Sequence, residues 1–317
     1  MASIYSDNFD VLITTTLDKV RPSLTDQITT ENVLLAWLNA NSRVTVDGGT
    51  VIRRPLIFAF NDTVGSYSGY DLIDVTPQEG IGWAEYPWKQ HAGSVVISGE
   101  EVEKNDGTAQ LINLLQAKLD QLKMSTADDL NAMLFADGTG NSSKDMLGLK
   151  ALVLNSGTVG EIAQSTYTWW ASVVGASTLD ITTLDGVRVM NNMYNSLRIN
   201  RSKVDIELTT QAIYEAYEEL ALPNLRFNDT RMADLGFESV NHKGASVVFD
   251  PDCDSGRLYM LNSDRLEFVQ KAGRWLDVTD FQRPYNQDAK VALILSMGNL
   301  ITDCRRAHGL FTGVTSS

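Results

Sequence analysis

Two segments in the first third of the chain alternate between apolar and polar positions with period two, which predicts β-strands. One face of the first segment carries Ile52, Arg54, Leu56, Phe58 and Phe60. In the second segment, Trp83, Glu85, Pro87 and Lys89 alternate with Ala84, Tyr86 and Trp88. We expect the segments to pair as the outgoing and return arms of a hairpin that occupies residues 51–98.

This hairpin is expected to project from the protein. Residues 61–80 between the arms are polar, contain Gly and Tyr, and have no clear period, and such a loop is longer than the ~12–15 residues usual in a compact domain. Pro55 and Pro87 cannot donate to a strand ladder, so both arms must be edge strands. A lone two-stranded ribbon is only marginally stable, and Trp83, Tyr86 and Trp88 are residue types enriched at interfaces. The pattern therefore predicts a ribbon that needs a partner surface.

The strongest helix signal follows directly. Ser98 and Glu101 form a capping box, and a second start is predicted at Asp106 and Thr108, after Gly107. An apolar stripe then continues until near Gly138; it comprises Leu111, Leu115, Leu119, Leu122, Leu130, Met133 and Leu134. About 30 residues of helix would span ~45 Å, which predicts a strut. An ordinary amphipathic helix over a sheet explains the stripe equally well, but it leaves the ribbon unexplained.

The remaining pattern predicts an α+β fold with a mixed sheet. Thr30 is expected to cap a short helix through Val33, Leu34, Trp37 and Leu38, after an irregular polar stretch over residues 1–23. A helix is expected from Thr183, and a second helix is expected after Thr210, which would cap it. Strands are expected at residues 204–208, 247–249, 257–261 and 266–269, and a long strand-like run covers residues 289–310.

In this order of elements the chain resembles the major capsid proteins of tailed bacteriophages, which have the Hong Kong 97 type of shell fold. The runs that carry the resemblance are Ile81-Gly-Trp-Ala-Glu-Tyr-Pro-Trp88, Ser98-Gly-Glu-Glu101, Ala109-Gln-Leu-Ile-Asn-Leu-Leu115, Gly160-Glu-Ile-Ala-Gln-Ser-Thr-Tyr-Thr-Trp-Trp170, Leu208-Thr-Thr-Gln-Ala-Ile-Tyr-Glu-Ala-Tyr217, Val247-Val-Phe-Asp-Pro-Asp252 and Asn286-Gln-Asp-Ala-Lys-Val-Ala-Leu293. The resemblance is weakest before Val51.

The resemblance implies five regions. These are an N-terminal arm with a short helix (residues 1–49), an extended loop (50–97), a peripheral domain with a spine helix (98–178), an axial domain (179–284) and a return strand of the peripheral domain (285–317). It also implies a structural protein of the virion that assembles with itself into pentamers and hexamers, in the host bacterial cytoplasm, and encloses double-stranded DNA. The implied partners are a separate scaffolding protein, a portal protein and a decoration protein.

Ribbon position and residue type predict which side chains contact a neighbouring subunit: Arg53, Arg54, Trp83, Trp88 and Lys89. The pair Arg305-Arg306 is a further candidate, with ordinary solvated charges as the alternative. Some members of the family crosslink through a lysine in the extended loop. Residues 51–88 contain no lysine, so we expect an uncrosslinked shell that boiling in detergent reduces to monomers.

Composition limits the function classes. The net charge is −14 with 26 Lys plus Arg, which opposes tight binding to a phosphate backbone. We therefore expect any enclosed DNA to be bound neither tightly nor sequence-specifically. No apolar run reaches the ~20 residues of a membrane span, and the first residues lack the pattern of a secretory signal. Cys253 and Cys304 have no ligand-like spacing, which suits a reducing cytosol.

No catalytic constellation is evident, so we expect no enzyme activity and no cofactor. His91, His242 and His308 lie in no triad or metal spacing, and packing roles are favoured for them. Asp250, Asp252 and Asp254 resemble the start of a calcium loop, but the glycine comes one place late and the twelfth position is Leu261. A turn between strands is favoured there. An encapsulin-type compartment and, less favoured, a metal-dependent acidic hydrolase remain the alternatives.

Overall fold

The computed structural model describes residues 32–104, 108–175, 178–221 and 240–316. The helices are α2 (Val33–Ala40), α3 (Gly99–Lys104), α4 (Thr108–Phe135), α5 (Gly140–Ser143), α6 (Leu149–Leu152), α7 (Leu184–Ser196) and α8 (Gln211–Ala221), with short 3-10 turns η2 (Ser263–Arg265) and η3 (Arg305–Ala307). The strands are β1 (Val44–Asp47), β2 (Ile52–Ile57), β3 (Ile81–Tyr86), β4 (Lys89–Ser98), β5 (Thr158–Val159), β6 (Ile162–Ala163), β7 (Val173–Val174), β8 (Leu179–Asp180), β9 (Ile206–Thr209), β10 (Val240–His242), β11 (Ala245–Phe249), β12 (Leu258–Leu261), β13 (Leu266–Lys271), β14 (Asp277–Val278), β15 (Ala289–Thr302), β16 (Gly309–Phe311) and β17 (Val314–Thr315).

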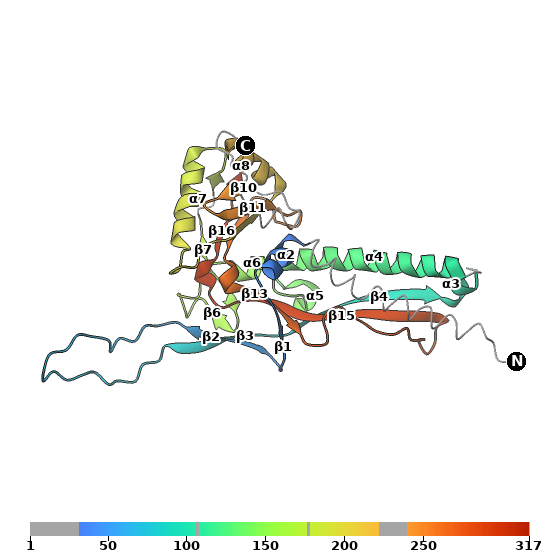
Figure 1. The fold of residues 1–317 in the computed structure, drawn as a ribbon, viewed down its shortest axis with the longest axis horizontal. Coiled ribbons are helices and arrows are strands. Elements are labelled where there is room, and N and C mark those ends of the chain that lie inside the picture. Colours follow the sequence, from blue (N-terminus) through green and yellow to red (C-terminus); the bar gives the residue numbers. More distant parts are fainter. Residues whose placement is uncertain (1–31, 105–107, 176–177, 222–239, 317) are drawn as a thin grey trace.

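Two long projections leave a central body in opposite directions (Figure 1). One is the ribbon of β2 and β3 with the loop between them. The other consists of α4 lying along β4 and β15. Above the junction, α7 and α8 flank the sheet that contains β10, β11 and β16. The expected combination of a projecting ribbon, a strut and a mixed α+β body is confirmed.

The five-stranded sheet has the order β1-β13-β15-β14, and β4 pairs with the outer part of β15. β1 runs parallel to β13, whereas β13, β14 and β4 are all antiparallel to β15. The β4–β15 register runs without a break from Lys89↔Gly298 to Ser98↔Ala289. Strands separated by about two hundred residues in the sequence therefore build the second projection.

The six-stranded sheet has the order β10-β11-β9-β12-β16-β7 and is buried on both faces. Tyr259 and Leu261 of β12 point into a core shared with α2, α4 and the five-stranded sheet. The alternate residues, Leu258 and Met260, enter a second core with side chains of α7 and α8. Burial on both faces explains why these strands are continuous apolar runs in the sequence.

The capping box before the strut is confirmed. The Ser98 N–H donates to Glu101 Oε2 (3.1 Å), and the Glu101 N–H donates to Ser98 Oγ (3.2 Å). After α3, the helix α4 begins at Thr108 as expected and ends at Phe135; its 28 residues span about 42 Å. Its buried side chains include Leu119, Leu130, Met133 and Leu134. Of the structure's described helices, none is both long and apolar enough to cross a membrane.

The cap of α2 differs from the prediction. Asn32 caps the helix: it directly precedes the first helical residue, Val33, and its Oδ1 accepts a hydrogen bond from the Leu35 N–H (2.9 Å). Thr30 and the predicted N-terminal arm lie outside the described residues. The helix expected from Thr183 is α7, and Thr183 caps it, since its Oγ1 accepts from the Gly186 N–H (3.1 Å).

The ribbon is shorter than the sequence pattern predicts. β3 pairs with β2 only from Ile81 to Tyr86, and the expected continuation of the return arm through Lys89 is wrong, because β4 pairs with β15 instead. Pro87 marks this change of partner. β13 lies in the five-stranded sheet, and β16 lies between β12 and β7 in the six-stranded sheet.

Candidate assembly surfaces

The ribbon exposes a long row of apolar side chains. Those with more than half of their surface exposed are Ile57, Phe60, Val64, Tyr67, Tyr70, Leu72, Ile73, Val75, Ile81 and Trp83. Tyr70 and Leu72 are 105% and 99% exposed, so they contact almost nothing in the described part of the chain. Soluble monomers rarely expose contiguous apolar patches of this kind unless a partner covers them.

The base of the ribbon is fixed to the body by residues 157–170. The Glu85 N–H donates to the Gly160 carbonyl (3.0 Å), and the Phe58 ring stacks on Trp169 with 5.3 Å between centroids and 11° between planes. Gly160 has φ +61°, and a Cβ there would lie 2.8 Å from Ala84 Cβ and 3.1 Å from the Tyr86 ring. Only glycine permits both this backbone conformation and the close approach of the ribbon.

Arg54 anchors the ribbon to the five-stranded sheet. Its Nε and Nη2 donate to the two carboxylate oxygens of Glu267, each at 2.9 Å, and Nη1 lies 3.4 Å from Asp47 Oδ2. Partial burial disfavours the guanidinium charge, but Glu267 and Asp47 more than offset this and raise the pKa of Arg54. The Gly48 N–H and Arg54 together lower the pKa of Asp47. This fork-to-fork geometry favours a fixed orientation of the strand.

The other predicted contact residues divide into two groups. Arg53 and Trp83 lie on the exposed part of the ribbon, where Arg53 pairs with Glu85 (2.8 Å) and its guanidinium carbon sits 5.9 Å from the centre of the Trp83 ring. Trp88 and Lys89 lie at the root. Lys89 Nζ donates to the Ser143 carbonyl, and the Trp88 Nε1–H donates to the Gly49 carbonyl (3.2 Å). Arg54, Trp88 and Lys89 thus have partners within the chain, and their contact with a neighbour stays a prediction.

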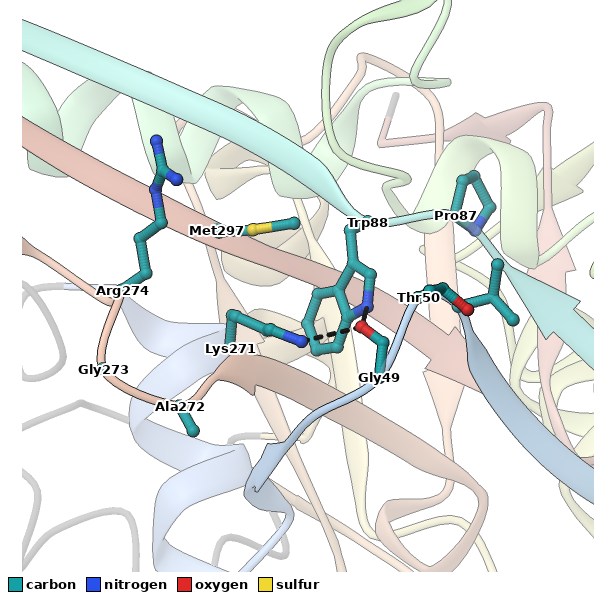
Figure 2. A pocket seen from close by; sticks show the side chains of 10 residues that line it. Gly49, Thr50, Pro87, Trp88, Lys271, Ala272, Gly273, Arg274 and Met297 are labelled. Carbon is teal, nitrogen blue, oxygen red and sulfur yellow. Dashed lines mark hydrogen bonds between the residues drawn. The ribbon is translucent and has the colours of Figure 1, made fainter.

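A pocket of about 710 Å³ opens at the root of the ribbon (Figure 2). We call it the root pocket; its lining residues are Gly49, Thr50, Val51, Pro87, Trp88, Lys271, Ala272, Gly273, Arg274 and Met297. Lys271 Nζ donates to the Gly49 carbonyl (2.7 Å) and lies 4.9 Å from the centre of the Trp88 ring. The lining contains two cations, a half-buried indole and no carboxylate.

Arg305 corrects one prediction. Its side chain is completely buried, so it cannot pair with a carboxylate of another subunit. The guanidinium donates to four backbone carbonyls between residues 152 and 170, those of Leu152 (3.0 Å), Leu154 (2.5 Å), Ser156 (3.1 Å) and Trp170 (3.1 Å). Burial lowers the pKa of Arg305 to about 10, which leaves it charged at neutral pH. Arg305 therefore holds the residues that precede the 157–170 segment and the last residue of that segment, Trp170.

The three alternate aspartates do not converge on one point. Asn131 Nδ2 donates to Asp250 Oδ1 (2.9 Å) and Asp252 Oδ2 (2.6 Å), whereas Asp254 pairs with Lys150 (3.0 Å) and Arg257 (3.2 Å). Burial raises the pKa of Asp250. Within the described part of the chain, no group of three or more His, Cys, Asp or Glu side chains is placed to hold a metal ion. This geometry favours the turn over the calcium loop.

The histidines occupy packing positions. His308 is fully buried, and burial lowers its pKa to about 4. His242 is buried between the rings of Tyr194 and Tyr217 and lies 2.6 Å from Glu207. His91 Nδ1 is 3.3 Å from Asp129. Each histidine therefore has a contact partner within the fold.

Comparison with solved structures defines the class of fold. The chain aligns with the capsid asymmetric unit of cyanophage A-1(L) at TM-score 0.65 and 18% identity, over 86% of this chain and 90% of that one. It aligns with the structure of Mycobacterium phage Bobi at TM-score 0.53 and 11% identity, over 88% and 90% of the two chains. The SrpI encapsulin of Synechococcus elongatus aligns at TM-score 0.53 and 9% identity, over 87% and 86%.

The chain therefore has the Hong Kong 97-type fold found in phage capsid proteins and encapsulins. No family profile matches the sequence, and no curated protein sequence matches it. The fold-level resemblance inferred from the ordered motifs is confirmed.

Several residues that shape these surfaces were not predicted from the sequence. Gly160 and Trp169 lie in a motif that carries the resemblance, but nothing local shows that they hold the ribbon. Lys271 and Arg274 lie on either side of Gly273, which predicts a turn. A turn signal does not show which distant residues the loop contacts in the fold. The burial of Arg305 has no sequence signal, because arginine is rarely buried without a carboxylate.

Proposed function

We propose that the chain is the major capsid protein of a tailed bacteriophage, which assembles with itself into pentamers and hexamers and closes an icosahedral shell around double-stranded DNA. The single observation that carries the proposal is the ribbon, which exposes apolar side chains from Ile57 to Trp83 in a fold shared with shell proteins. In a shell, an adjacent copy covers that surface. The protein is then structural and not an enzyme.

In this proposal the regions take the roles that the resemblance implies, with boundaries adjusted to the sheets. The ribbon is the extended loop, α4 with β4 and β15 forms the peripheral domain, and the six-stranded sheet with α7 and α8 forms the axial domain. Assembly takes place in the bacterial cytoplasm with a separate scaffolding protein, and portal and decoration proteins join the particle. The net charge of −14 is consistent with a shell that encloses DNA without binding it tightly.

An encapsulin-type compartment is the second candidate, because the SrpI encapsulin has a similar fold. The two candidates differ in what the shell encloses. Particles that carry DNA, or that need a scaffolding protein, support the capsid, whereas a copurifying cargo enzyme supports the compartment. The acidic hydrolase is disfavoured because Asp254 is paired away from Asp250 and Asp252.

The test is to express the full chain alone and with a candidate scaffolding protein, and to image the soluble fraction by negative-stain electron microscopy. Closed shells, capsomer rings or sheets are the expected result. A monodisperse monomer under both conditions would contradict the proposal.

A further inference from the structure

A second, smaller pocket lies where the start of α2, the inner half of α4 and the turn after β11 meet (Figure 1). Its volume is about 220 Å³, and we call it the acidic pocket. Its polar lining consists of the carboxylates of Asp128, Asp250 and Asp252 and the carboxamides of Asn32 and Asn131, without any Lys or Arg. Among the described residues, no ion pair reaches any of the three carboxylates. The described part of the chain therefore supplies no counter-charge to this lining.

Both carboxamides of the acidic pocket have one atom without a hydrogen-bond partner among the described residues. Asn32 is 3% exposed; its Oδ1 caps α2, whereas its Nδ2 is buried and unpartnered. Asn131 Nδ2 donates to Asp250 and Asp252, whereas Asn131 Oδ1 is buried and unpartnered. Buried polar atoms in folded proteins are nearly always hydrogen-bonded. The pocket thus offers a donor and an acceptor in addition to its carboxylates.

The carboxylates favour a cationic ligand. Asp250 is 1% exposed; burial raises its pKa and the Asp252 charge acts in the same direction, so positive charge in the pocket would stabilise the ionised form. A bare metal ion suits the site poorly, because the Asn131 amide already occupies one oxygen of Asp250 and one of Asp252. An ammonium group donates three hydrogen bonds at ordinary distances and can therefore serve acceptors that do not converge on one point.

An ammonium group alone would leave the Asn32 donor without an acceptor. The ligand must therefore carry an oxygen acceptor close to its ammonium group. The amino terminus of a polypeptide has this pair, in its α-ammonium and the carbonyl of its first residue. A free amino acid has it too, but its carboxylate would be repelled by the three aspartates. The pocket volume of about 220 Å³ lies below the ~300–1,000 Å³ of sites for drug-sized ligands and suits a group the size of one or two residues.

We infer that the acidic pocket binds the amino terminus of a polypeptide. The α-ammonium lies against the carboxylates and Asn131 Oδ1, and the first carbonyl accepts a hydrogen bond from Asn32 Nδ2. This inference goes beyond the proposed function and concerns a site within one subunit, so it does not depend on shell assembly. Its failure would leave the proposed function intact.

Calorimetry with a defined probe tests the inference. Glycylglycinamide, whose only charge is its α-ammonium, is titrated into the full chain, and we expect one saturable site per chain. N-acetylglycinamide lacks the charge and should not bind, and propylamine lacks the carbonyl and should bind at least about tenfold more weakly. Absence of glycylglycinamide binding, or equal binding of propylamine, would overturn the inference. Saturable binding of Ca²⁺ that excludes glycylglycinamide would assign the pocket to a metal and would also overturn it.

Matched substitutions locate the bound probe. Asp250→Asn keeps the Oδ1 acceptor but removes the charge, and it should weaken glycylglycinamide binding at least about tenfold. Asp128→Asn, at an exposed position, should act in the same direction and replaces Asp250→Asn if that variant does not fold. Asp120→Asn, exposed on α4 and outside the pocket, is the control and should bind like the wild type.

The Asn32 donor has a test of its own. Asn32→Ser keeps a side-chain cap for α2 but removes the Nδ2 donor. It should lower the affinity for glycylglycinamide to that for propylamine and leave propylamine binding unchanged. If the preference for glycylglycinamide persists in Asn32→Ser, or if neither aspartate variant weakens binding, the probe lies elsewhere and the inference is wrong.

Discussion

The two projections of this molecule are both built on antiparallel strand pairs, yet in the described part of the chain only one of them is covered by a helix. Over β4 and β15, ten residue pairs align, and α4 packs against them so closely that a Cβ on Gly93 would lie 2.8 Å from Leu122 Cδ1. Val95 and Ile97 of β4 are consequently buried. The β2–β3 ribbon has six residue pairs; Ile52, Leu56, Ala84 and Tyr86 are buried on one face, whereas Ile57, Ile81, Trp83 and the apolar side chains of the loop are exposed.

This difference shows where the chain depends on another molecule. A two-stranded ribbon gains little stability by itself, so α4 stabilises the first pair and the fastening at Gly160 holds only the base of the second. Among the described residues, nothing covers the remainder of the ribbon, and the proposed shell would supply that cover from an adjacent copy. Four predictions test this contrast.

The largest effect is expected from removing the uncovered part. Deletion of residues 62–79 leaves 59–61 as a three-residue loop between Phe58 and Gly80, a length that hairpins accept. We expect a folded chain with an almost unchanged melting temperature and no closed shells in electron micrographs. Replacement of the same residues by a Gly/Ser segment of equal length should also abolish shells, because the side chains are needed and not only the reach. Normal shells from either variant would refute the role of the ribbon.

Removal of the Arg305 side chain should instead lower the stability of the folded body of the protein. Arg305→Ala leaves four carbonyls without their donor, and we expect a loss of more than about 3 kcal/mol in the free energy of unfolding, measured by urea denaturation. Arg306→Ala, at the neighbouring exposed position, is the control and should change the stability by about 0.5 kcal/mol or less. Equal effects of the two substitutions would mean that the Arg305 hydrogen bonds contribute nothing specific.

An added methyl group should separate the ribbon from the body. Gly160→Ala introduces a Cβ against Ala84 at a residue with positive φ, whereas Gly157→Ala meets nothing within 4 Å at φ +84°. The control variant reports the backbone cost alone, about 1–2 kcal/mol. We expect Gly160→Ala to be less stable by a further ~1–3 kcal/mol and to assemble poorly. Indistinguishable melting curves would show that the ribbon base can shift freely.

The smallest effect is expected from the adjacent arginines. Arg54→Ala removes a partly buried, two-pronged pair with Glu267 and should cost ~1.5–3 kcal/mol. Arg53→Ala removes an exposed pair with Glu85 and should cost ~0–1 kcal/mol in thermal unfolding. If Arg53 contacts a neighbour, its substitution lowers the shell yield at nearly unchanged stability. The reverse order of stabilities would contradict the anchoring role of Arg54.

The sequence predicts those features whose determinants are close together along the chain. Ser98 and Glu101 are three residues apart, and the alternation from Ile52 to Leu56 lies within one strand, so the capping box and the ribbon base are both predicted. The pairing of β4 with β15 joins residues about two hundred positions apart, and the period-two pattern of residues 89–97 fits either partner strand equally well.

The candidate surfaces follow the same rule. The exposed character of Trp83 is predicted, because it depends on an edge strand and on a long polar loop. The root pocket is not predicted, because Trp88 comes from the end of the return arm and Lys271 from a distant hairpin. Asp250, Asp252 and Asp254 show the opposite case. Their local spacing suggests one calcium site, but in the structure Asn131 binds Asp250 whereas Lys150 pairs with Asp254, and both partners are distant in sequence.

The position of Arg305 also bears on the timing of biogenesis. The ribbon leaves the ribosome early, but the guanidinium that secures its docking loop is synthesised more than two hundred residues later, after β15 has supplied the partner for β4. A nascent chain therefore exposes the apolar side chains of the ribbon before the ribbon base is fixed to the body of the protein. The contacts that hold the ribbon base can therefore be complete only when synthesis has passed Arg305.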